Sequence, residues 1–465
     1  MGGVDPRDRE ILRLAVPAFG ALVAEPLYVL VDTAIVGRLG TLPLGGLAVA
    51  GAVLTAGFGV FNFLAYGTTA AVARRIGARD DRAAAEHGIA GLWLALGLGV
   101  ALTALGLLLA PPIVDAMGAS ERVRPYALTY LRIGLLGAVP LLCTLAATGY
   151  VRGLQDTRTP LAIALGSNLL NLVLDLVLIY GFDLGIAGSA WATVLAQTTG
   201  AAAFLVVVSR RARAAHASPR PVPAYVREAL VVGGQLTVRT TALLAVFTTT
   251  TAIASRIGDD EVAAHQVAWQ IWLFLALALD AIAIAGQAIV GRTLGAADVG
   301  GTRASARRMI EWGVVAGGVA AAVVIAARPF LASAFTDDPA VRDHLLVVLW
   351  AVAVMQPLGA VVFVLDGILI GAGESRHLAG GDARRGRGVR ARGGAGARRG
   401  RRSARAVGCA VRLHARPDVR DARPVPRRRL ARRRSDPELT RRAAGLERPS
   451  ALVCTGSPRP GFLAW

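Results

Sequence analysis

The chain has 465 residues, of which 54% are hydrophobic and 18% are charged. Soluble globular domains seldom reach this hydrophobic fraction, whereas proteins that cross a bilayer many times do. The formal net charge of +20 is unevenly distributed, because residues 380–465 hold 24 Arg and 6 acidic residues while residues 1–379 hold 27 Arg and 25 acidic residues. The body of the protein is therefore nearly neutral, and its isoelectric point is no argument for a nucleic-acid-binding protein.

Residue types that carry chemistry in enzymes are sparse. Of the three cysteines, only Cys143 lies in the apolar body, which excludes a disulfide framework. The six histidines are scattered without the spacing of a metal site, and no nucleophile–base pairing or phosphate-binding loop is recognisable. We therefore expect no enzyme, no cofactor and no structural metal.

Apolar runs long enough to cross a hydrocarbon core of roughly 30 Å as helices follow one another along the chain. Helices are expected at 11–36, 44–73, 84–110, 125–150, 160–181, 186–209, 228–255, 262–291, 309–335 and 342–371. The first run is too long for the apolar core of a secretory signal peptide. A polar stretch rich in Pro and Arg, residues 210–225, separates the sixth run from the seventh.

A sequence repeat relates the two sides of this polar stretch. Residues 65–80 align without a gap on residues 283–298, and the same shift in residue number aligns residues 153–158 on residues 371–376. We call this constant offset the repeat shift. Charged and glycine positions coincide in both alignments, which makes chance similarity between apolar helices a poor explanation. An even number of spans per copy makes the copies parallel, an arrangement that transporters use to form a binding site between two halves.

The repeat predicts an all-α polytopic membrane protein of two parallel lobes, with six helices expected in each. The N-terminal lobe would occupy residues 1–209, a cytoplasmic linker residues 210–225, and a C-terminal lobe with four helices residues 226–376. About ten membrane-spanning helices are therefore present. An Arg-rich segment, residues 377–465, follows them.

This Arg-rich segment replaces two helices that the repeat demands. Its composition is that of a disordered or out-of-frame segment. We favour out-of-frame translation, because a chain rich in Ala and Gly and without Lys indicates a GC-rich gene. The alternative is a basic tail that binds anionic lipid or nucleic acid. Only Phe462 and Trp465 are aromatic there, so no stacking platform supports specific nucleic-acid binding.

The distribution of arginine predicts the orientation in the membrane. With the N-terminus in the cytoplasm, about 19 Arg would lie inside and about 7 outside, as the positive-inside rule demands. The turns at the opposite ends of the helices are acidic, as at Asp183. We therefore expect a multi-pass protein of the plasma membrane with a cytoplasmic N-terminus.

Ionisable side chains within membrane helices are costly and mark ion or substrate pathways. Glu25 and Asp32 lie seven residues apart on one face of the first helix. The fifth helix carries a polar stripe of Asn168, Asn171 and Asp175. Asp32 and Asp175 are expected to meet around a proton or Na⁺, since carboxylate and amide oxygens suit a hard cation. Alternatively, the asparagines only link helices by hydrogen bonds.

The second half of the chain carries a different polar set. Its charged candidates are Arg239, Asp280 and Asp366, with Gln287 nearby. These residues would extend the cation or substrate pathway into the second lobe. The alternative is a static ion pair, because Arg239 lies well inside its predicted helix and needs an acidic partner.

Several short motifs of this chain occur together in one family of membrane transporters. In chain order they are Glu25-Pro26, Val31-Asp32-Thr33, Gly37-Arg38-Leu39-Gly40, Gly153-x-x-Asp156-Thr157-Arg158, Asn171-x-x-x-Asp175, and Leu365-Asp366-Gly367 before Gly371-Ala372-Gly373. Over residues 10–376 the chain resembles the multidrug and toxic compound extrusion (MATE) family, and most of all its DNA-damage-inducible, DinF-like branch. It departs from that family's pattern by lacking the eleventh and twelfth helices.

The resemblance implies a two-lobed exporter that expels organic, often cationic, compounds in exchange for inward H⁺ or Na⁺. It also implies that Asp32 couples transport to the cation, with Asn171 and Asp175 beside it. Asp366 would correspond to a cation-binding acid of the second lobe. Protonation of the Asp32 cluster is expected to change the bend of the first helix and so to drive release outward.

We therefore predict a monomeric, cation-coupled antiporter that exports drugs or metabolites by alternating access, with small organic molecules, cations among them, as substrates. One alternative is a lipid-precursor flippase of the same superfamily, which would need a cationic cavity supplied by Arg239 and Arg132. Another is a non-functional remnant, or a membrane-tethered protein that binds anionic partners through its basic tail.

Overall fold

The computed structural model describes residues 5–336 and 338–373, and every regular element in these ranges is helical. The elements are α1 (Pro6–Gly37), α2 (Thr41–Gly59), η1 (Val60–Asn62), α3 (Phe63–Gly77), α4 (Asp81–Ala116), α5 (Arg124–Leu136), α6 (Ala138–Gly153), α7 (Arg158–Asp175), η2 (Leu176–Gly181), α8 (Gly185–Ala214), α9 (Pro223–Ala254), α10 (Asp259–Gly295), α11 (Val299–Phe335) and α12 (Pro339–Ala372). Nine segments in the described ranges are long and apolar enough to span a membrane, or ten with the bent pair α5–α6.

The predicted all-α polytopic fold with about ten spans is thereby confirmed. The division into lobes at 1–209 and 226–376 stays a prediction, and the Arg-rich segment 377–465 lies outside the described residues. The predicted linker 210–225 is shorter than expected, because α8 continues to Ala214 and α9 begins at Pro223. Arginine is a good helix former, and Arg211 and Arg213 in the last turn of α8 interact favourably with its dipole.

Three runs that were predicted as single helices are interrupted. In the run 160–181, α7 is followed by the π-helix η2 from Leu176. The run 44–73 contains the 3₁₀ turn η1, which follows two glycines of low helix propensity, Gly57 and Gly59. The run 125–150 bends by 46° between α5 and α6. At Gly137, which lies between them, a Cβ atom would be 2.4 Å from the Gln197 side-chain oxygen of α8. A residue with a side chain at this bend would therefore require the Gln197 side chain to move.

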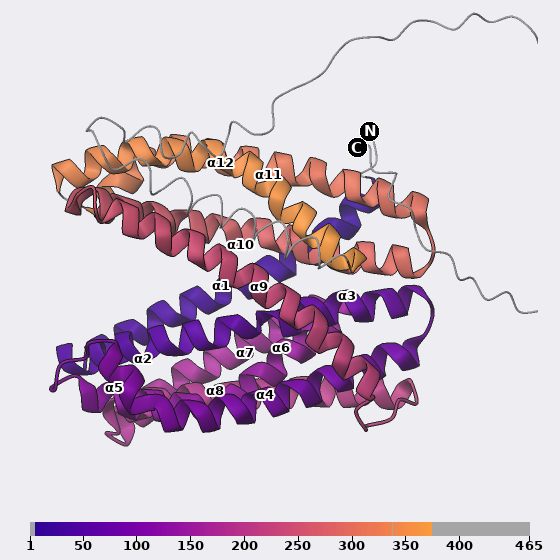
Figure 1. Cartoon of the computed structure of the whole chain (residues 1–465), viewed down its shortest axis with the longest axis horizontal. Helices are drawn as coiled ribbons and strands as arrows, with labels where there is room; N and C mark the ends of the chain where they lie inside the picture. Colours follow the sequence, from indigo (N-terminus) through magenta and orange to yellow (C-terminus); the bar gives the residue numbers. More distant parts are fainter. Residues whose placement is uncertain (1–4, 337, 374–465) are drawn as a thin grey trace, which may run out of the picture. The chain divides into compact units, whose positions relative to one another are not determined.

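The helices form two groups, which Figure 1 shows on either side of the oblique helix α9. One group consists of α2 to α8, and the other consists of α10 to α12. Helix α1 packs against both groups, because Ile11 and Leu14 in its first half join a buried cluster with Ile289 of α10. In its second half, Val36 joins a cluster with Leu131 of α5. Helix α1 is thus one of the elements that link the two groups.

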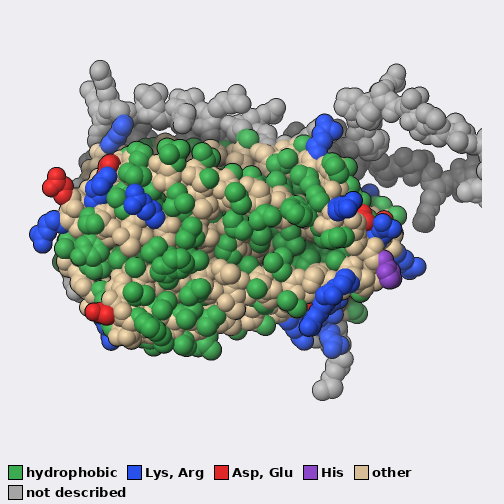
Figure 2. Space-filling model, turned by 90° about the horizontal axis from the view of Figure 1, so that it is seen from below, with side chains coloured by type: hydrophobic (Ala, Val, Ile, Leu, Met, Phe, Trp, Pro, Cys, Tyr) green, Lys and Arg blue, Asp and Glu red, His purple; other side chains and the backbone are tan. Residues whose placement is uncertain are grey.

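The surface matches a membrane environment. Figure 2 shows hydrophobic side chains over the middle of one face, with charged side chains gathered towards its two ends. Large apolar side chains such as Leu108 and Phe330 are 73% and 71% exposed. Such exposure is costly in water, whereas lipid tails solvate these side chains at no comparable cost.

Candidate functional site

Two carboxylates from different helices are buried together in the first group. Asp32 near the end of α1 is 4% exposed, and Asp175 at the end of α7 is 1% exposed. Asp32 accepts a hydrogen bond of 2.7 Å from the Ser189 hydroxyl of α8. The two carboxylates lie near enough for their charges to interact. Two like charges in a dry site repel each other strongly, so this arrangement favours the binding of a positive charge between them.

Asn171 and Thr193 connect the Asp175 carboxylate to α8. Asn171 lies one turn before Asp175 on α7 and is 3% exposed. The amide orientation that satisfies its neighbours lets Asn171 Nδ2 donate to Asp175 Oδ2 at 2.8 Å, while its oxygen accepts from the Thr193 backbone N–H at 3.1 Å. The second oxygen, Asp175 Oδ1, is buried and has no hydrogen-bond donor among the described residues.

Hydroxyl groups complete the surroundings of the two carboxylates. Tyr28, one turn before Asp32, shares a hydrogen bond of 2.8 Å with the Thr193 hydroxyl. Tyr130 of α5 is 6% exposed and lies beside Thr193 and Ser189. We name the set Asp32, Asp175, Asn171, Ser189, Thr193, Tyr28 and Tyr130 the first acidic cluster. Among the described residues, every side chain that hydrogen-bonds its two acids is neutral.

Sequence reasoning found the acids of this cluster and Asn171, but not the hydroxyl residues. Ser189 and Thr193 lie four residues apart on α8, so they share one face of that helix. Tyr28 precedes Asp32 by the same spacing on α1. These spacings were available signals. Without the packing of α8 on α1 and α7, however, they are indistinguishable from other hydroxyl residues in apolar helices.

The other two candidates of the first half lie outside this cluster. The Glu25 side chain is exposed, although it lies two turns from Asp32 on the same helix. Asn168 Nδ2 donates to the Ala24 carbonyl oxygen of α1 at 2.9 Å, close to Pro26. This contact is of the kind expected for a residue that links helices, which was the alternative role considered for the asparagines.

The candidates of the second half form a charge-balanced network, which we name the second acidic cluster. Arg239 of α9 forms an ion pair with Asp366 of α12. Asp280 of α10 accepts a hydrogen bond of 3.1 Å from the Tyr66 hydroxyl of α3, and it lies within electrostatic range of Arg152 and Arg239. Here each acid has a basic residue in its surroundings.

Gln287, the remaining candidate, lies elsewhere on α10. It is 2% exposed, and its side-chain oxygen has no hydrogen-bond partner among the described residues. The α-carbon of Gln287 would be 3.1 Å from a Cβ atom added at Gly371, so Gln287 lies where α10 and α12 pack closely.

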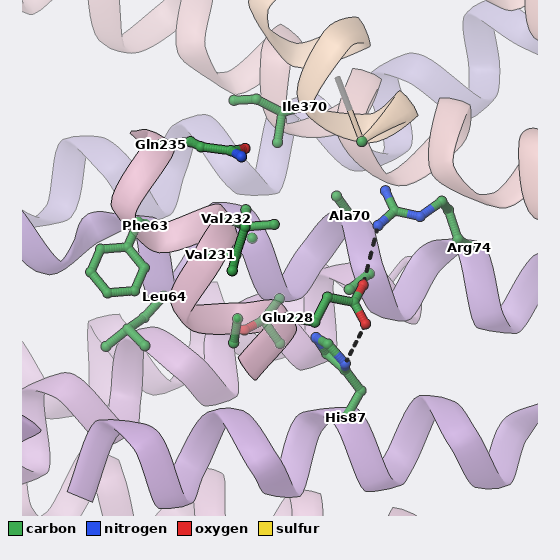
Figure 3. A pocket seen from close by; sticks show the side chains of 15 residues that line it. Phe63, Leu64, Ala70, Arg74, His87, Glu228, Val231, Val232, Gln235 and Ile370 are labelled. Atoms are coloured by element: carbon green, nitrogen blue, oxygen red, sulfur yellow. Dashed lines mark ion pairs between the residues drawn. The ribbon is translucent and has the colours of Figure 1, made fainter. Parts of the chain in front are cut away.

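A cavity of about 270 Å³ lies where α9 and α12 meet α3 and α4. Figure 3 shows Glu228 of α9 between Arg74 of α3 and His87 of α4, with apolar side chains such as Phe63 and Val232 lining the rest of the cavity. Glu228 is 3.9 Å from both Arg74 and His87. No sequence pattern singled out this cavity, although the repeat shift relates Glu228 to another glutamate near the N-terminus, Glu10.

Comparison with known proteins gives one family. The family model described as MatE matches residues 17–177 and 238–379, which is more than half of the chain. Protein DETOXIFICATION 44, chloroplastic, of Arabidopsis thaliana is 35% identical over 390 residues, covering 80% of this chain and 73% of that protein. DNA damage-inducible protein F of Escherichia coli is 32% identical over 290 residues, covering 60% of this chain and 62% of that protein.

Solved structures show the same fold. A MOP superfamily transporter from Pyrococcus furiosus superposes with a TM-score of 0.73 at 24% identity, covering 81% of this chain and 85% of that one. A MATE structure in a bent conformation gives the same TM-score. Members of this family are transporters of small organic compounds rather than enzymes. The resemblance predicted from the motifs is thus confirmed, and the chain belongs to the MatE family of multi-pass membrane transporters.

Proposed function

We propose that this transporter exports small organic compounds across the plasma membrane in exchange for H⁺ or Na⁺, with its N-terminus in the cytoplasm and as a monomer. The observation that carries the proposal is the first acidic cluster. Its two buried carboxylates are hydrogen-bonded only by neutral groups within the described residues. A site of this kind is costly when empty and becomes favourable when it holds a proton or a cation.

The donor set suits either coupling ion. Carboxylate and hydroxyl oxygens are hard ligands of the kind that Na⁺ binds, and a carboxylate also accepts a proton. Asp175 Oδ1 has no donor among the described residues and is the atom at which we place the incoming charge. The structure itself favours neither ion, so the test below uses a gradient of each in turn.

Occupation of this site would be transmitted by α1. Asp32 lies on the second half of α1, beyond Pro17 and Pro26. Prolines inside a helix remove backbone hydrogen bonds and allow it to bend. Because the two halves of α1 pack on different groups of helices, a change of bend would alter how the groups approach each other.

Two observations favour an exporter over the rival functions. A flippase for anionic lipid precursors needs free cationic groups, yet Arg239 is paired with Asp366. Probable multidrug resistance protein NorM of Thermotoga maritima is 29% identical over 212 residues, which supports drug-like substrates. Residues 377–465 lie outside the described residues. Whether this segment binds anionic partners is therefore decided by the experiment below.

The test uses the full chain of 465 residues reconstituted into vesicles. A fluorescent organic cation is the probe, and either a proton gradient or a Na⁺ gradient drives its movement. We expect Asp32→Asn to reduce gradient-driven transport at least about tenfold, because it removes one of the two negative charges that attract the coupling ion. Asp115→Asn, which alters an exposed pair with Arg124, is the control and should leave transport unchanged.

Equal transport by Asp32→Asn and the unaltered chain would contradict this proposal. Absence of transport with either gradient in the unaltered chain would favour the alternative that the protein is a non-functional remnant of a transporter. Salt-sensitive binding to anionic vesicles that is lost on removal of residues 377–465 would then favour the tethered binding protein.

A further inference from the structure

The two copies of the repeat meet through a reciprocal pair of glycines. A Cβ atom added to Gly77 of α3 would lie 1.9 Å from the Arg292 carbonyl oxygen of α10. A Cβ atom added to Gly295 of α10 would lie 1.9 Å from the Arg74 carbonyl oxygen of α3. The repeat shift relates the two glycines to each other and the two arginines to each other. The same backbone contact is therefore made twice, once from each side.

The side chains of the same two arginines form a second reciprocal pair. Arg292 forms an ion pair of 2.6 Å with Glu10 of α1, and Arg74 lies 3.9 Å from Glu228 of α9. Glu10 and Glu228 are also related by the repeat shift. In each pair, the first helix of one copy provides the carboxylate and the other copy provides the guanidinium.

Each arginine also donates a hydrogen bond to a residue of the opposite copy. Arg292 donates to the Gln155 side-chain oxygen at 2.7 Å, and Arg74 donates to the Gly371 carbonyl oxygen at 3.0 Å. Gln155 and Gly371 belong to the segments 153–158 and 371–376, which the repeat aligns. The two acceptors are not equivalent residues, but the glycine contacts and the ion pairs both obey the repeat shift, which indicates that they work as one unit.

The two halves of this unit differ in strength. The Glu10 half is reinforced by Arg308, which donates to Asp8 at 2.7 Å, and by Trp312, whose Nε1 donates to Asp8 at 2.8 Å. The repeat equivalents of Asp8 and Arg308 are Val226 and Ala90, so this clamp exists only once. The Glu228 half is reinforced differently, because Arg75 of α3 donates to Glu228 at 2.8 Å, closer than Arg74. This half borders the cavity of Figure 3, which His87 also lines.

We propose that Gly77, Gly295, Arg74, Arg292, Glu10 and Glu228 form a two-fold latch. The latch holds the two copies together at the cytoplasmic end of the bundle and opens when the transporter faces inward. This proposal rests on the alternating-access function above. The glycines allow backbone contact that any Cβ atom would prevent, and the side chains of the ion pairs are 23–37% exposed, so each pair is weak enough to break.

The test measures opening without measuring transport. Ala70 and Ala288, 3% and 1% exposed, are buried in clusters between the copies and are related by the repeat shift. Each would be replaced singly by cysteine in a chain whose Cys143, Cys409 and Cys454 are changed to alanine. The rate at which a membrane-impermeant maleimide, applied from the cytoplasmic side, modifies the new cysteine reports how often the latch opens.

We expect Gly77→Ala and Gly295→Ala each to raise the modification rate at least about tenfold, because a Cβ atom cannot fit against the opposing carbonyl oxygen. Glu10→Gln and Glu228→Gln should each raise it two- to fivefold, which corresponds to up to ~1 kcal/mol per exposed pair. Gly97→Ala and Gly318→Ala, where a Cβ atom meets nothing within 4 Å, are the matched glycine controls. Glu86→Gln, which alters an Arg82 pair inside one helix, is the matched charge control.

Rates in Gly77→Ala and Gly295→Ala equal to those of the glycine controls would overturn the latch. A variant that does not fold is recognised by size-exclusion chromatography. The exchanged pair Glu10→Arg with Arg292→Glu then supplies a second criterion, because it should restore a rate that either single change raises. The labelling rates could follow these expectations in a chain that transports no probe. This result would support the latch and contradict the proposed export function, so failure of one proposal is distinguishable from failure of the other.

Discussion

The two acidic clusters differ in charge balance more than in burial. In the first cluster, Asp32 and Asp175 are contacted by hydroxyl groups and an amide. In the second, Asp366 pairs with Arg239, and Asp280 has Arg152 nearby. A balanced ion pair satisfies its own charges, whereas two acids with neutral donors need a charge from outside. This difference is why we propose cation exchange at the first cluster and a structural role for the second.

The sharpest test of this contrast is stabilisation by the coupling cation. A ligand that binds only the folded protein raises the free energy of unfolding by about 2.7 kcal/mol at a concentration of 100 Kd. We expect added Na⁺, or a lower pH if H⁺ is the ion, to raise the thermal unfolding midpoint of the unaltered chain in detergent. Asp175→Asn should lose this response, whereas Asp366→Asn should keep it. A response that survives Asp175→Asn would place the cation elsewhere.

A second test compares folding stability in the absence of the cation. Asp366→Asn removes one partner of a largely buried ion pair, whose side chains are 20% and 16% exposed. We expect a loss of about 2 kcal/mol, below the 3–5 kcal/mol of fully buried pairs because this pair is partly solvated. Asp32→Asn should be neutral or stabilising, since it removes charge repulsion within its cluster. Chemical denaturation measures both, and equal losses would erase the distinction between the clusters.

The smallest expected effect concerns the helix contact beside the first cluster. Asn168→Ala removes the hydrogen bond to the Ala24 carbonyl oxygen. Hydrogen bonds between membrane helices contribute about 0.6 kcal/mol on average, so we expect a loss of this size and nearly unchanged transport. Leu169→Ala, an exposed position of the same helix, is the control. A loss of cation response in Asn168→Ala would extend the first cluster to this residue.

The sequence was a good guide where a single physical signal dominates. Apolar length predicted the spans, because the bilayer fixes how long a helix needs to be. The same reasoning missed the 46° bend between α5 and α6, where Gly137 lies close to Gln197 of a distant helix. Likewise, Arg239 had two possible acidic partners, and only the three-dimensional structure shows that it pairs with Asp366 of α12.

The hydroxyl residues of the first acidic cluster show the same limit of prediction from sequence. Asp32 and Asp175 were noticeable because carboxylates are rare inside membrane helices. Ser189 and Thr193 were not, since hydroxyl residues are frequent there and also bond to the backbone of their own helix. Thr198 and Thr199, for example, donate to carbonyl oxygens of α8 itself. Their sequence context gives no sign of which hydroxyl faces an acid.

Helix α1 is long enough to connect the two faces of the membrane mechanically. At a rise of about 1.5 Å per residue, the helical stretch from Asp8 to Asp32 corresponds to about 36 Å, which exceeds the thickness of the hydrocarbon core. One end of α1 carries Asp32 of the first cluster. At the other end, Arg308 and Trp312 hold Asp8 by hydrogen bonds. If the first cluster takes up a charge as we propose, a change in the bend of α1 near one membrane face would exert mechanical force on the ion pairs at the other.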